Sequence, residues 1–222
     1  MARAPRVDVG DLIYHVINRA NGRQQIFHTP ADYQHFERLL GEAKDRTDMR
    51  ILAYVLMPNH WHLVLSSKND GDVQKFMHWL TLTHTQQYHV QTKTIGYGHL
   101  YQGRYKSFLI EKESYLLTVI KYVERNPVRA RLSKTVENWK WGSGYRRLKG
   151  TSKEQKLLAS LPIDLPKNYA TCVNQPDRED DLTQLRVAVT KGTPFGDVEW
   201  VGETVQRFKL SATLRNPGRP KK

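Results

Sequence analysis

Two hydrophobic periods alternate along the N-terminal two thirds of the chain. Stretches that alternate in polarity and are rich in β-branched and aromatic residues predict strands, whereas apolar residues recurring at helical spacing predict helices. The predicted strands are Leu12–Asn18, Ile51–Met57, His60–Ser66 and Tyr105–Ile110. The predicted helices run from Pro30 through Ala43, from Val73 to about Gln91 and from Ser114 to Arg125.

Local signals set the connections between these elements. Thr29 is a favourable N-cap before Pro30 at the first helical position, and Asn126-Pro127 ends the last of these helices. The short Pro58-Asn59 turn forces its two flanking strands to be antiparallel. The order βαββαβα then predicts a ferredoxin-like α+β sheet with helices on one face.

The chain changes character after Gly150. We expect one domain over residues 1–150 and a polar, proline-containing linker over 151–181 with a short helix at most. A small helical and basic extension is predicted over 182–222, with helices at Leu182–Thr190 and Val198–Phe208. Proline and glycine keep the basic tail after Leu214 extended.

Charge favours a polyanionic partner. Lys and Arg number 35 against 22 Asp and Glu, so the formal net charge of the 222 residues is +13. Between Leu100 and Gly150 twelve basic residues face four acidic ones, and eight of the aromatic residues are interleaved with them. Cations neutralise phosphates and aromatic faces stack on unpaired bases, so nucleic acid is favoured over a merely solvated basic surface.

Membrane insertion and disulfide bonding are both disfavoured. The longest apolar stretch, Ile51–Met57, is far shorter than the roughly 20 residues that a span requires. Cys172 is the only cysteine, so an intrachain disulfide or a cysteine-rich zinc site is excluded. These features predict a cytoplasmic protein.

The sequence His60-Trp61-His62 lies in a predicted strand. Side chains alternate between the faces of a strand, so His60 and His62 point the same way and Trp61 points oppositely. Two imidazoles on one face provide half of a metal site. Two ordinary histidines on a sheet face are the alternative.

A second pair lies on the helix that ends before Pro127. Tyr122 and Asn126 are one turn apart on one face, at the edge of the apolar stripe. An edge residue can reach a cleft while its helix is anchored in the core. The alternative is a tyrosine at the margin of the core and an asparagine that caps the helix.

These motifs together resemble the single-tyrosine HUH transposases, and within them the REP-associated tyrosine transposases of bacteria. The resemblance rests on YHVINR at 14–19, AYVLMPNHWHLVL at 53–65, YQGRYKSF at 101–108 and IKYVERNPVRA at 120–130. It runs from about Val9 to Lys149 in consistent order. The tail from Gly192 also resembles the C-terminal extension of part of that branch.

The resemblance implies roles for individual residues. His60 and His62 match two metal ligands, Tyr122 matches the nucleophile, and Asn126 matches a third ligand position that is often Gln in relatives. Two imidazoles with an amide oxygen suit Mg²⁺ or Mn²⁺ as cofactor, and the preference of imidazole alone would also allow Zn²⁺. Eight basic residues are predicted to contact DNA: Arg19, Arg23, Arg104, Lys106, Arg125, Arg129, Arg215 and Arg219.

Four further tyrosine and histidine positions could compete with this set or support it. Tyr115 is a competing nucleophile two turns before Tyr122, but its position predicts a core residue. His15 lies in the first strand and is predicted to support the site from behind. His84 and His89 are given no role.

The implied activity is nicking and rejoining of single-stranded DNA at hairpin-forming, REP-like palindromes through a covalent 5′-phosphotyrosine. We expect a monomer that acts at the bacterial nucleoid. Two other functions stay open from the sequence: a palindrome-binding protein or repressor without catalysis, and a metal hydrolase that acts on RNA.

Overall fold

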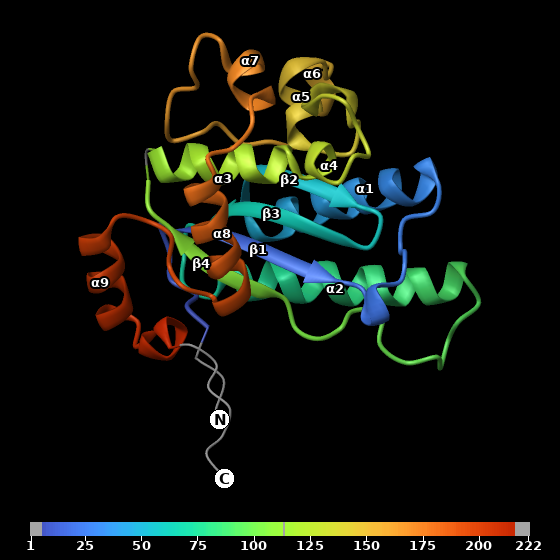
Figure 1. Ribbon diagram of the computed structural model, residues 1–222. Coiled ribbons are helices and arrows are strands. Elements are labelled where there is room, and N and C mark those ends of the chain that lie inside the picture. Colours follow the sequence, from blue (N-terminus) through green and yellow to red (C-terminus); the bar gives the residue numbers. More distant parts are fainter. Residues whose placement is uncertain (1–5, 113, 216–222) are drawn as a thin grey trace.

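The computed structural model describes residues 6–112 and 114–215, and Figure 1 shows its architecture. A four-stranded sheet in the order β2-β3-β1-β4 forms the centre, and its neighbouring strands are antiparallel. The strands are β1 (Ile13–Arg19), β2 (Arg50–Met57), β3 (His60–Ser66) and β4 (Lys106–Ile110). This arrangement confirms the predicted α+β class.

Helices connect and surround the sheet. Those of the N-terminal part are η1 (Asn21–Arg23), α1 (Pro30–Thr47), α2 (Asp72–Gln91), α3 (Ser114–Glu124) and α4 (Asn126–Arg129). They are followed by η2 (Val136–Asn138), α5 (Ser143–Leu148), α6 (Ser152–Gln155), α7 (Tyr169–Asn174), α8 (Glu179–Lys191), α9 (Val198–Arg207) and η3 (Ser211–Leu214). No helix among the described residues is long and apolar enough to cross a membrane.

The local signals have the structural effect that their chemistry predicts. The side chain of Thr29 caps α1 in a capping box with Asp32, and Pro30 occupies the first turn. Met57 pairs with His60 across the two-residue turn. The α3 helix ends at Glu124, and a second short helix, α4, begins at Asn126 with Pro127 in its first turn.

The predicted placement of all helices on one face of the sheet is wrong. One hydrophobic cluster joins α1 and α2 to one face, and a second joins α3 and α8 to the other. Figure 1 shows the same division, with α3 and α8 in front of the sheet and α1 and α2 behind it. The physical reason is that β2 and β3 are buried along almost their whole length, which requires cover on both sides.

The segment predicted as a linker is packed against the first domain. It contains two helices, α6 and α7, in place of one short helix at most. Ala159 N–H donates to Ile51 O of β2 (2.9 Å), and Tyr169 Oη donates to a carboxylate oxygen of Glu124 (2.5 Å). Residues of α8 share a hydrophobic cluster with β4 and α3, so the extension is part of the same core.

Segments from later in the chain cover both edges of the sheet. On β2, Leu56 N–H donates to Trp141 O (2.9 Å), and Val55 bridges to Gly142. On β4, Phe195 N–H donates to Leu109 O and Glu111 N–H donates to Phe195 O, both at 2.9 Å. Backbone groups that would otherwise be open at these points are therefore paired within the chain.

Glu124 of α3 connects the first domain to the segment 151–181 by a buried hydrogen bond. Its side chain is fully buried and accepts hydrogen bonds from Ser143 Oγ (2.6 Å), Arg147 Nε (3.1 Å) and Tyr169 Oη (2.5 Å). A buried carboxylate is tolerated only with such partners, because its desolvation is costly. Three segments of the chain thus meet at one carboxylate.

We predict that Tyr169→Phe lowers the free energy of unfolding by about 1–3 kcal/mol, because it leaves a buried carboxylate one hydrogen bond short. Urea denaturation measures the change. Tyr97→Phe is the matched control, since Tyr97 is 84% exposed. An equal effect of both substitutions would contradict the proposed role of this contact.

Candidate active site

Side chains of β3 point alternately to the two faces of the sheet, so Trp61 lies on one face and His60 and His62 lie on the other. Trp61 is fully buried on the α1 and α2 side, where its Nε1 donates to Tyr101 Oη (3.0 Å). Tyr101 Oη in turn lies 2.6 Å from His84 Nδ1, so His84 belongs to this buried network. His60 and His62 therefore face the α3 side, with their ring centroids 5.2 Å apart.

Each of these two histidines has one ring nitrogen held by a neighbour. His60 Nδ1 lies 2.7 Å from Asn59 Oδ1, and His62 Nδ1 lies 2.8 Å from His15 Nε2. His15 is fully buried and stacks on Phe108 at a centroid distance of 4.7 Å. These contacts orient both rings and leave Nε2 of each as the nitrogen suited to a ligand.

Burial keeps the three imidazoles neutral. It lowers the pKa of His15 to about 3. Burial, assisted by the positive charge of Arg19, lowers the pKa of His60 to about 4. The pKa of His62 is also far below its ordinary value, through burial and then the neighbouring His15 and His60. Neutral imidazole is the form that binds a metal ion.

Tyr122 approaches this group from α3. Its ring centroid lies 6.0 Å from that of His62 and 6.5 Å from that of His15. The guanidinium of Arg129 lies over the tyrosine ring, 4.2 Å from its centroid. Burial raises the pKa of Tyr122, and the positive charge of Arg129 is the largest opposing effect.

Asn126 begins α4, four residues after Tyr122. Its Nδ2 is buried and has no hydrogen-bond partner within the described part of the chain, so the amide has unused capacity. Residues 6–112 and 114–215 hold no group of three His, Cys, Asp or Glu side chains suited to a metal. A divalent ion at His60 and His62 would need further oxygen ligands, and the amide oxygen of Asn126 is the one predicted from the sequence.

Asp177 holds two of the predicted DNA-binding arginines. Its Oδ2 accepts from Arg125 Nε (3.1 Å) and Arg129 Nη1 (2.9 Å), and its side chain is only 7% exposed. Arg125 is buried and also donates to Val173 O and Asn174 O. These contacts give Arg125 a structural role and do not support its predicted contact with DNA.

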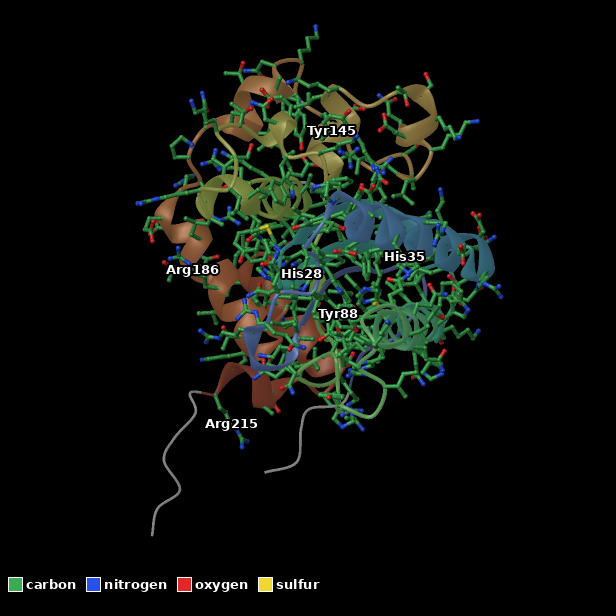
Figure 2. The ribbon with its side chains drawn as sticks, turned by 90° about the vertical axis from the view of Figure 1, so that its right-hand side faces the viewer. His28, His35, Tyr88, Tyr145, Arg186 and Arg215 are labelled. Atoms are coloured by element: carbon green, nitrogen blue, oxygen red, sulfur yellow. The ribbon has the colours of Figure 1, made fainter. Side chains whose placement is uncertain are left out.

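The other predicted DNA contacts lie in different surroundings. Arg19, Arg104 and Lys106 line one cleft, and Arg23 is exposed on η1. Arg215 is exposed, and Figure 2 shows it low on the molecule, apart from Arg186 of α8 and from His28. Arg219 lies outside the described residues.

Several residues of the site carried little or no signal in the sequence. Asp177 lies in the predicted linker, and Arg186 on α8 is one of the cations that favour ionised Tyr122. Both are more than 50 positions from Tyr122 in the sequence, so no local period relates them. Tyr115, predicted to be a core residue, is partly buried and packs against the cluster of α3 and β4, beside Phe195.

Comparison with known proteins places this geometry in a family. The family model described as "Transposase IS200 like" matches residues 8–126, which is more than half of the chain. The chain belongs to the IS200-like transposase family. Membership in this family implies an enzyme, and the matched range contains both histidines, the tyrosine and Asn126. No curated protein matches this IS200-like chain.

Two solved structures resemble this IS200-like transposase at 18% identity. One, described as a REP-associated tyrosine transposase bound to a REP hairpin, has a TM-score of 0.51 and covers 66% of this chain and 84% of its own. The other, a candidate transposase from Deinococcus radiodurans R1, has a TM-score of 0.39 and covers 62% of this chain and 98% of its own. The first likeness supports the fold.

The buried imidazoles make stability depend on pH. In the unfolded chain these histidines are protonated as the pH falls below about 6.5. In the folded protein the pKa of His15 is about 3 and that of His60 about 4, so both stay neutral well below pH 6.5. The free energy of unfolding therefore decreases as the pH falls from 6.5 toward these values. We predict that His15→Leu reduces the number of protons bound on unfolding by about one, which lowers the slope of the free energy of unfolding against pH.

Urea midpoints measured between pH 7 and 4.5 give the number of protons. The same substitution at the exposed His78 is the control. An unchanged slope in His15→Leu would show that His15 takes up its proton in the folded protein.

Proposed function

We propose that this chain is a metal-dependent transposase of the REP-associated branch, which nicks and rejoins single-stranded DNA at hairpin-forming palindromes. The observation that carries the proposal is the approach of Tyr122 to His62, 6.0 Å between ring centroids, beneath the guanidinium of Arg129. A nucleophile, a neutral ligand pair and a fixed cation share one site. The hairpin-bound relative supports hairpin DNA as the substrate.

In the proposed reaction, the Tyr122 oxygen attacks the scissile phosphorus. A bond forms between Tyr122 Oη and phosphorus, and the bond from phosphorus to the 3′-oxygen breaks. The proton lost from the phenol is balanced by the proton that the 3′-oxygen gains. Water is not consumed, so the phosphodiester energy is kept and the reverse attack by a 3′-hydroxyl rejoins strands.

The protein's own charges assist the loss of the phenol proton. Burial raises the pKa of Tyr122, so attack needs stabilisation of the ionised oxygen. Arg129 makes the largest contribution, followed by Arg186 and then Arg19, while the charge of Asp177 acts against them. Asp177 holds Arg129 in place through a 2.9 Å ion pair, so Arg129 acts from a fixed position.

His60 and His62, with the Asn126 amide, would hold the divalent ion. When bound, Mg²⁺ or Mn²⁺ supplies charge neutralisation at the scissile phosphate. His15 is a positioning residue. If His62 binds through Nε2, its Nδ1 carries the proton and donates to His15 Nε2, which fixes the ring orientation.

The surface around the site suits DNA. Arg23, Arg104 and Lys106 are exposed cations at the end of the sheet where β1 ends and β3 and β4 begin. Figure 2 views the molecule from the side toward which the β1 arrow points in Figure 1. We propose that these cations, and Arg215 with Arg219 of the tail, bind phosphates of the hairpin and its flanking strand.

We propose that the protein acts as a monomer. The backbone pairing of Trp141 and Gly142 with β2, and of Phe195 with β4, occupies the positions through which two sheets would join edge to edge. The His and Tyr side chains of the proposed site come from one chain. A partner subunit is therefore not needed to complete it.

The first test of this function is Tyr122→Phe. We predict that covalent protein–DNA adduct falls more than about 1000-fold, because the attacking oxygen is removed. Hairpin affinity changes less than about threefold, because phosphate contacts and stacking remain. A denaturing gel with a labelled hairpin and Mn²⁺ measures the adduct, and fluorescence anisotropy measures binding.

Tyr115→Phe is the control, since Tyr115 is partly buried at the margin of the core and packs against Phe195. Normal cleavage by Tyr122→Phe would refute the nucleophile assignment. Binding without cleavage by the unmodified protein, with or without metal, would support the repressor alternative. Free 5′-phosphate ends without an adduct would support a hydrolase.

The metal assignment has a readout that is independent of catalysis. We predict that His60→Ala and His62→Ala each abolish measurable Mn²⁺ binding, and that His15→Phe weakens it about 10- to 100-fold. Electron paramagnetic resonance of free Mn²⁺ measures the affinity. His89→Ala is the control, because His89 Nδ1 contacts Thr94 Oγ1 (2.7 Å) away from the site. Unchanged affinity in folded His15→Phe would exclude a positioning role.

A further inference from the structure

A cleft of about 460 Å³ opens beside the proposed catalytic group. Its lining comes from three parts of the chain: the end of β1, the segment that leads into β4, and the last turn of α8. The lining residues are Ile17, Asn18, Arg19, Gln102, Gly103, Arg104, Lys106, Val189 and Thr190. A cleft of this size accommodates one nucleotide.

Arg19 brings unused hydrogen-bonding capacity to this cleft. Its Nε is buried and has no hydrogen-bond partner among the described residues. Arg129, Arg146 and Arg147, by contrast, each have a carboxylate oxygen within 3.1 Å. A partly buried guanidinium without an anion nearby is matched in charge and geometry to a phosphate.

The backbone holds Arg19 firmly. Arg19 N–H donates to Asn18 Oδ1 (2.9 Å), and Gln102 N–H donates to Arg19 O (2.9 Å). The second bond attaches the segment before β4 to the end of β1, so the cleft is built around the position of Arg19. Because the main chain at Arg19 is fixed, binding of an anion there requires no rearrangement of the backbone.

The location relates this cleft to the reaction. Arg19 pairs with His60 across β1 and β3, and opposite residues of an antiparallel pair lie on the same face of the sheet. The charge of Arg19 acts on His60, His62 and Tyr122. A phosphate held by Arg19 is therefore a close neighbour of the phosphate that Tyr122 attacks.

The α8 helix of the C-terminal extension forms the opposite wall of the cleft. Val189 of α8 offers an apolar surface, and Lys106 Nζ donates to Thr190 O (3.5 Å), which joins α8 to the start of β4. The amide of Gln102 stands at the rim, and amides recognise base edges through paired hydrogen bonds. A second cleft, of about 600 Å³, has Asp164 as its charged residue and no cation in its lining.

We propose that this cleft binds the unpaired nucleotide next to the scissile phosphate. Arg19 holds the phosphate, Val189 packs against the base, and Gln102 reads the edge of the base. This inference rests on the proposed function. It assigns to the C-terminal extension a part in selecting the single-stranded flank of the hairpin, through the α8 wall.

The test compares hairpins with and without a flank in the Tyr122→Phe protein, where binding is separated from chemistry. The probe is a six-pair DNA hairpin that carries four randomised nucleotides on its 5′ side, on its 3′ side, or no flank. Fluorescence anisotropy gives the gain in affinity that the flank adds. We expect Arg19→Gln and Val189→Trp to reduce this gain about 10- to 100-fold while hairpin-only affinity changes less than about threefold.

Two matched controls sharpen the result. Val187→Trp places the same ring on α8 at a residue that is 40% exposed and does not line the cleft. Arg23→Gln removes a nearby exposed cation and should weaken hairpins with and without a flank by the same factor. Thermal melts establish that each variant is folded. If Val187→Trp removes the gain as fully as Val189→Trp, the cleft is not the binding site.

A third variant, Gln102→Ala, does not disturb the core, because Gln102 is exposed. Sequencing of the bound randomised flanks should show a base preference at one position, and Gln102→Ala should remove that preference. A flank gain that persists in both Arg19→Gln and Val189→Trp overturns the inference. If the unmodified protein forms the Tyr122 adduct in that case, the proposed function stands and the cleft assignment alone fails. If it forms no adduct and shows no flank gain, both fail.

Discussion

The burial of β3 on both faces is the constraint on which the rest of the site depends. A strand in this position must present apolar side chains to both layers, and its odd and even positions go to different helices. The side that carries Trp61 is closed by α1 and α2. The side that carries His60 and His62 is covered by α3 and α8, and this cover brings Tyr122 to the imidazoles.

Polar groups in such a location need partners, and the partners shape the chemistry. His15 is fully buried, and its Nε2 lies 2.8 Å from His62 Nδ1. This contact orients the ring and assigns Nε2 to any ligand. Burial also lowers the pKa of all three histidines, so the same constraint keeps them in the neutral form.

The region after residue 150 is integral to this arrangement. Asp177 forms ion pairs with both Arg125 and Arg129, and the guanidinium of Arg129 lies over the Tyr122 ring. Phe195 pairs with β4, and Val189 forms one wall of the Arg19 cleft. A segment that resembles a linker in composition therefore positions the cation nearest the nucleophile, and the helix after it limits the space beside the site.

The sequence by itself determined the parts that depend on local periods and capping. It predicted the bounds of β3 and the start of α1 at Pro30, and it placed His60 with His62 and Tyr122 with Asn126 as pairs. His60 and His62 are separated by one period of β3, whereas Tyr122 lies on α3 and Asn126 begins α4. Side-chain direction within a strand or a helix is a local property.

Tertiary structure alone decided how these pairs meet and what surrounds them. The covered second face, the packed linker and the ion pairs of Asp177 all join residues that are distant in the sequence. Burial also leaves Arg19 Nε without a hydrogen-bond partner among the described residues. Arg125 and Arg19 are both arginines in or beside predicted elements, yet one is committed to Asp177 and the other faces a cleft. That difference arises from which segment packs on each residue, and a long-range contact of this kind leaves no period in the sequence.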